Sequence, residues 1–77
     1  MADYRWRGAN RRGVTIGVTT AEPAELAAIV EDRFRTGWRS LTVRLDGTEV
    51  AGIGPDPSRP RRRTWWAESH KEVASGG

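Results

Sequence analysis

The sequence contains no cysteine and only one histidine. The missing cysteines exclude disulfides, and together with the single histidine they argue against a structural zinc site. No apolar run approaches the roughly 18 residues that span a bilayer, and the N-terminus lacks the apolar stretch of a secretory signal. We therefore expect one domain of 77 residues in the cytoplasm, with no metal, no cofactor and no membrane contact.

The sequence also lacks a catalytic motif. GIGPDP has the glycines of a phosphate-binding loop, but prolines follow where such a loop needs a lysine and the start of a helix. His70 has no partner that would make it a catalytic base, and we expect it to be solvated. Glu22 and Glu25 fit the charge preference of a helix N-terminus better than a pair of catalytic carboxylates. These patterns predict that the protein is not an enzyme.

One helix is strongly predicted in TAEPAELAAIVEDRFRTG. Thr19 or Thr20 can cap it, and Glu22 stands three residues after Thr19, as in a capping box. Pro23 falls in the first turn, where its missing N–H is not needed. Apolar residues at three- and four-residue spacing form one stripe along this helix, made of Leu26, Ile29, Val30 and Phe34.

Strands are predicted on both sides of this helix. VTIGVTT alternates β-branched and small residues before it, and Tyr4–Arg7 can form an edge strand within the basic N-terminal segment 1–13. After it, Asp46-Gly47 is the preferred pair for a two-residue hairpin turn. That turn places Arg44 opposite Glu49 on the outer face and Val43 opposite Val50.

The last elements are a proline-rich loop and a short strand. Strict alternation along the hairpin would turn Ile53 outward, unless Gly52 hosts a bulge that returns it to the core. Three prolines in GPDPSRP predict a loop, and RRTWWAE then returns as a final strand. Residues 69–77 are small and polar, which is typical of a flexible tail.

These elements predict an α+β domain over residues 14–68. A single helix packs on one face of a small antiparallel sheet, in the order (β)-β-α-β-β-β. The expected core joins the helix stripe to the apolar strand residues, which are Val14, Ile16, Val18, Leu41, Val43, Leu45 and Val50.

A second pattern concerns binding rather than folding, because three adjacent arginines precede Trp65 and Trp66. Neighbouring strand residues point to opposite faces, so one tryptophan faces the core and the other outward, and we favour Trp66 as the outward one. An outward aromatic among arginines is typical of single-stranded nucleic acid binders, because every base has a face that can stack. The candidate binding residues are Arg5, Arg7, Arg44, Arg59, Arg61, Arg62, Arg63, Trp65 and Trp66.

Two functions stay open for this small basic protein of net charge +3. A nucleic-acid-binding module would use the arginines for phosphate and the tryptophan for bases. Alternatively, the exposed residues dock on a larger protein or on a second copy of the chain. Four tryptophans are more aromatic surface than one helix covers, which favours a homodimer with Trp65 or Trp66 near its interface. A purely structural interpretation packs the outer tryptophan under the N-terminal segment.

Overall fold

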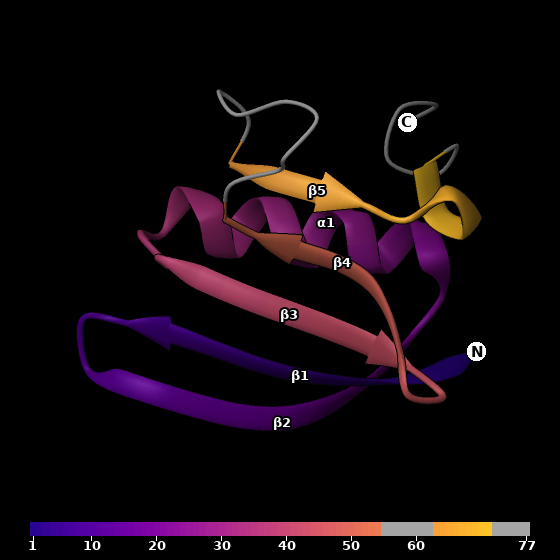
Figure 1. Ribbon diagram of the computed structural model, residues 1–77, viewed down its shortest axis with the longest axis horizontal. Coiled ribbons are helices and arrows are strands. Elements are labelled where there is room, and N and C mark those ends of the chain that lie inside the picture. The colour runs from indigo at the N-terminus through magenta and orange to yellow at the C-terminus, as the bar shows by residue number, and fades with distance from the viewer. Residues whose placement is uncertain (55–62, 72–77) are drawn as a thin grey trace.

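The computed structural model describes residues 1–54 and 63–71 of the chain. Within them, antiparallel strands form a single sheet, and one helix packs on one of its faces (Figure 1). The elements in chain order are β1 (Ala2–Asn10), β2 (Gly13–Ala21), α1 (Pro23–Arg35), β3 (Ser40–Leu45), β4 (Thr48–Ile53), β5 (Thr64–Trp66) and the short 3₁₀ helix η1 (Glu68–His70). The expected α+β class, with one helix on an antiparallel sheet, is confirmed.

The sheet has the strand order β2-β1-β3-β4-β5, so the N-terminal strand lies inside it. β1 pairs with β2 without interruption from Ala2↔Ala21 to Asn10↔Gly13, and its other side pairs with β3. A two-residue turn closes this hairpin, and the side chain of Asn10 accepts the Arg12 N–H at 2.8 Å. The prediction of an edge strand at the N-terminus was therefore wrong, because β2 forms that edge.

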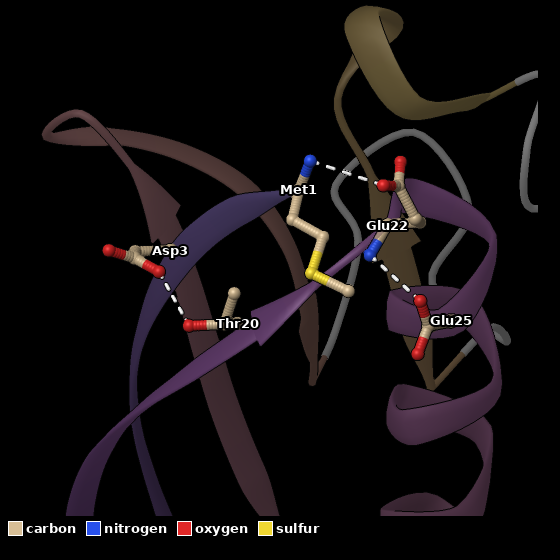
Figure 2. A network of polar contacts seen from close by, with 5 residues as sticks. All are labelled: Met1, Asp3, Thr20, Glu22 and Glu25. Carbon is tan, nitrogen blue, oxygen red and sulfur yellow. Dashed lines mark hydrogen bonds and ion pairs between the residues drawn. The ribbon is translucent and has the colours of Figure 1, made fainter.

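α1 is capped at Glu22 rather than at either threonine. Glu22 is the N-cap, and its backbone N–H donates to Oε1 of Glu25 at 3.2 Å (Figure 2). Pro23 follows at the first helical position, as the sequence predicted. Thr19 and Thr20 continue β2 instead, because their main chains extend the pairing with β1.

The core lies between α1 and one face of the sheet. Its buried apolar residues are Tyr4, Ala21, Leu26, Val30, Leu41, Val43, Val50, Ala51 and Ile53. The bulge of the predicted hairpin is present, but the register slips at Val43/Arg44, opposite Val50, rather than at Gly52. Both Val50 and Ala51 are consequently buried, and Val43 pairs with Ala51.

Two parts of the expected core were wrong. Val14, Ile16 and Val18 are 65%, 73% and 59% exposed. The register places Gly17 beside Trp6 on the helix side, and a Cβ at Gly17 would lie 2.5 Å from Cζ2 of Trp6. The indole of Trp6 thus fills the space that the β2 side chains were expected to fill.

Phe34 is the other exception, with 40% of its surface exposed. Leu26 and Val30 are buried, and the next inward position of the helix falls on Arg33 rather than on Phe34. The guanidinium of Arg33 lies 4.0 Å from the ring centroid of Trp6, so a cation and an aromatic ring meet where two apolar side chains were expected.

Candidate binding surface on the open sheet face

One face of the sheet is uncovered in the described part of the chain. α1 lies on the opposite side, where it contacts β4, β5 and the end of β2 (Figure 1). Successive strand residues point to opposite faces, so the neighbours of the buried Tyr4 and Val43 point away from the helix. We call this second surface the open face, and its side chains include Arg5, Arg7, Val14, Ile16, Val18, Thr42, Arg44, Glu49 and Trp65.

Three exposed arginines lie together at the centre of the open face. Arg5 of β1 is directly opposite Arg44 of β3, and Arg7 follows two residues along β1, opposite Thr42. Among the described residues, none of these three guanidinium groups forms an ion pair. Like charges directly opposite one another destabilise a sheet, and the carboxylate of Glu49, which lies opposite Arg44 in β4, offsets part of that cost.

Trp65 is the outward tryptophan, and the preference for Trp66 was wrong. Trp66 pairs with Ala51 and packs against the core, whereas Trp65 pairs with Gly52 and lies on the open face. A Cβ at Gly52 would lie 2.6 Å from Nε1 of Trp65, so the glycine allows the half-buried indole to rest on the main chain of β4. One row of paired residues runs from Trp65 through Gly52 and Thr42 to Arg7.

The structure thus brings together Arg5, Arg7, Arg44 and Trp65 from the predicted set. Arg63 is exposed immediately before β5, and its carbonyl accepts the Gly54 N–H at 2.7 Å. Trp66 belongs to the other face. The remaining candidates, Arg59, Arg61 and Arg62, lie outside the described residues.

Beside the arginines, the outer edge of the open face is apolar. Val14, Ile16 and Val18 of β2 point outward, opposite Ala9, Arg7 and Arg5 of β1. The sequence interpretation missed this stripe because it assigned these residues to the core. The available signal was Gly17, flanked by Thr15 and Thr19, since small residues on one side of a strand leave room for a large neighbour.

The helix side holds an aromatic cluster that sequence reasoning also missed. The guanidinium of Arg33 lies 4.0 Å and 4.7 Å from the ring centroids of Trp6 and Trp38, which meet edge to face at 5.8 Å. Burial lowers the pKa of Arg33, and the nearby Asp32 opposes that effect. Among the described residues Nη1 of Arg33 has no hydrogen-bond partner although it is buried, so the two rings are its main stabilising contacts there. This cluster fixes the C-terminal end of α1 to β1.

His70 is buried at 6% exposure, contrary to the expected solvated residue. Its Nε2 shares a hydrogen bond of 3.0 Å with the Tyr4 hydroxyl, and its Nδ1 lies 2.9 Å from Oγ of Ser69. η1 therefore packs against β1, and residues 69 and 70 are not part of a tail. Burial, and secondarily the charge of Glu22, raises the pKa of Tyr4. This buried pair has a structural role in joining the two ends of the domain.

Comparisons with protein-family models, curated proteins and solved structures found no match for this chain. In residues 1–54 and 63–71, no helix is long and apolar enough to cross a membrane, and no group of side chains is suited to hold a metal ion. Any proposal of function therefore rests on the geometry of the open face.

Proposed function

We propose that the protein is a small non-enzymatic module that binds single-stranded nucleic acid on its open face. The observation that carries this proposal is the exposed pair Arg5 and Arg44, directly opposite one another, with Arg7 beside them. In the described part of the protein these arginines form no ion pair, although Glu49 lies opposite Arg44, and phosphate groups supply further counter-charge. Arginine also donates to phosphate through two parallel N–H groups, which suits an extended backbone.

Trp65 supplies the second component of such a site. Its ring rests on Gly52 and shares a row with Arg7, three strands away. At a strand spacing of about 4.8 Å, the two positions are roughly 14 Å apart across the sheet. The exposed side of the indole is a platform for a base, while the arginines track the backbone.

A protein partner is the competing interpretation, and the charge distribution favours nucleic acid. Arginine and aromatic residues are enriched in protein interfaces as well, so their presence alone does not separate the two partners. What favours a polyanion is the arrangement: the arginines of the open face lie on the neighbouring inner strands β1 and β3, and Arg5 lies directly opposite Arg44. A row of phosphates suits like charges set side by side in this way.

The proposal predicts a salt-dependent affinity that can be measured by fluorescence anisotropy with a labelled single-stranded oligonucleotide. Three phosphate contacts give a log–log salt slope of about −2, at roughly −0.7 for each contact. Replacing both Arg5 and Arg44 by alanine should flatten the slope by roughly 1.4. Trp65→Ala should weaken binding by about 1–3 kcal/mol, because the stacked base is lost.

The matched control is the double replacement of Arg35 and Arg39 by alanine, which removes the same charge from exposed positions outside the open face. It should leave the slope almost unchanged. If both double variants lost the same amount of affinity for the oligonucleotide, net charge alone would account for the binding. Absence of binding at low salt, or equal displacement of the oligonucleotide by polyglutamate, would contradict the proposal.

A further inference from the structure

Within the described residues, β2 is a long edge strand with none of the usual protection against pairing with another strand. Its nine residues, Gly13–Ala21, include no charged residue and no proline, and its register with β1 contains no bulge. Edge strands of soluble proteins normally carry such features because a free edge is a template for another chain. Among the described strands, only β1 pairs with β2, which lies at the rim of the sheet (Figure 1).

The direction of the main chain identifies which groups of β2 are free. The carbonyl of Ala9 accepts the Arg39 N–H at 2.9 Å, so the main-chain groups of Ala9 point away from β2. In an antiparallel strand the main-chain groups of successive residues point to alternate sides, so the odd-numbered residues of β1 face away from β2, as Ala9 does. The even-numbered residues of β1 are therefore the ones that form hydrogen bonds with β2. Their partners in β2 are odd-numbered. It follows that the N–H and C=O groups of Val14, Ile16, Val18 and Thr20 point out from the free edge.

The two ends of β2 carry opposite charges. The turn before it contains the exposed Arg11 and Arg12. At its other end lie the exposed carboxylates of Asp3, Glu22 and Glu25, of which Glu22 is 3.1 Å from the N-terminal ammonium (Figure 2). If the β2 strands of two copies ran parallel, like charges would lie together at each end. If two copies instead stacked open face against open face, their arginines would repel each other. An antiparallel pair of β2 strands instead places each basic turn against an acidic end.

We propose that two copies of this chain pair through β2, antiparallel and about a two-fold axis at Gly17. Val14 then lies opposite Thr20 of the second copy, and Ile16 lies opposite Val18. Each such pair exchanges two main-chain hydrogen bonds, and the β-branched side chains cover one another. The same register places Arg12 opposite Glu22 of the second copy. This match of opposite charges favours this register over others.

The pairing produces one continuous sheet with both helices on one side and both open faces on the other. The proposal does not depend on what the open face binds. A nine-residue strand is about 30 Å long, and pairing along one edge buries less than the roughly 1,200–2,000 Å² of a standard stable interface. We therefore expect a weak dimer whose population rises between micromolar and millimolar protein concentration.

Sedimentation equilibrium over that concentration range tests the pairing. The wild-type mass should rise from monomer towards dimer, and Ile16→Lys should remain monomeric because it adds a charge at the free edge. Thr42→Lys is the matched control, since Thr42 occupies the same row of the open face two strands further in. It should dimerise like the wild type. A monomeric wild type at millimolar concentration, or equal disruption by both lysines, would overturn the proposal.

The register is tested by disulfide trapping, because the chain has no cysteine of its own. A mixture of Val14→Cys and Thr20→Cys chains should form the mixed disulfide, which mass spectrometry separates from the two homodimers. Each variant alone should cross-link poorly, since two copies of residue 14 would be six residues out of register, about 20 Å apart. Homodimeric disulfides in place of the mixed one would overturn the register about Gly17. Circular dichroism of every variant checks that the sheet is retained.

Discussion

The helix-side face and the open face of this sheet are built from the same strands, yet their contents are nearly opposite. On the helix side, Tyr4, Leu41, Val43 and Ala51 are at most 2% exposed. On the open face, the alternate positions carry arginine, threonine and an uncovered apolar stripe. The difference is not a simple division by hydrophobicity, because β2 turns threonine and glycine inward and valine and isoleucine outward. The volume of Trp6 over Gly17 decides which side of β2 packs.

Arginine shows the same contrast at the level of single residues. Arg33 is held between two indole rings on the helix side, where burial lowers its pKa. Arg5 and Arg44 are exposed and face one another across the open face without ion pairs in the described part of the chain. One residue type thus fastens the helix to the sheet, while on the opposite face it forms a concentrated positive surface.

The largest effect should come from Leu26→Ala, which removes a side chain that is 2% exposed at the centre of the helix-side core. We expect a loss of about 2–5 kcal/mol in the free energy of unfolding. That loss is comparable with the whole stability of so small a domain, about 3–5 kcal/mol. Urea denaturation followed by circular dichroism measures it.

Phe34→Ala is the control, and its loss should stay below about 1 kcal/mol because Phe34 is 40% exposed. Equal losses for the two variants would contradict the division of the helix into a buried stripe and an exposed end.

A smaller effect is expected from Gly17→Ala, which tests what determines the orientation of β2. Alanine normally suits a strand better than glycine, yet here its Cβ would lie 2.5 Å from the Trp6 ring. We expect a loss of about 1–3 kcal/mol through overpacking. Thermal melting detects this change, and a variant as stable as the wild type would show that Trp6 does not occupy the space above Gly17.

The smallest expected effect concerns alkaline pH and the buried Tyr4. Its pKa is raised above the ordinary value of 10.0, so the folded protein retains the phenolic proton longer than the unfolded chain does. The resulting stability is fully present below pH 10.0 and is lost as pH rises through the raised pKa. Tyr4→Phe should remove this part of the alkaline loss. Denaturation midpoints of the wild type and Tyr4→Phe, measured from below pH 10.0 upward, report this difference in stability. If the two midpoints fell equally with rising pH, the raised pKa of Tyr4 would be contradicted.

Local patterns of the sequence were enough to predict much of the fold. Asp46 and Gly47 adopt positive φ angles of 51° and 80°, as a tight hairpin turn requires, and Arg44 pairs with Glu49 as expected. Leu26 and Val30 form the buried part of the predicted stripe. These predictions succeeded because each depends on residues close together in the chain.

Features that depend on distant contacts were not predictable in the same way. Alternation required Trp65 and Trp66 to point to opposite faces, but only the pairing of Trp66 with Ala51 decides which one is outward. The structure places Arg5, Arg7 and Arg44 on the same face as one tryptophan, but that tryptophan is Trp65 rather than the favoured Trp66. His70 could not be placed from its neighbours, because its main partner, Tyr4, is 66 residues away in the chain.

The most direct test of the two-face account uses the indole N–H signals of the four tryptophans in a ¹H–¹⁵N spectrum. Trp6, Trp38 and Trp66 pack on the helix side, whereas Trp65 lies on the open face. Titration with a single-stranded oligonucleotide should shift the Trp65 signal progressively and leave the Trp6 and Trp38 signals in place. Shifts confined to Trp6 and Trp38, or four unchanged signals at saturating oligonucleotide, would contradict the account.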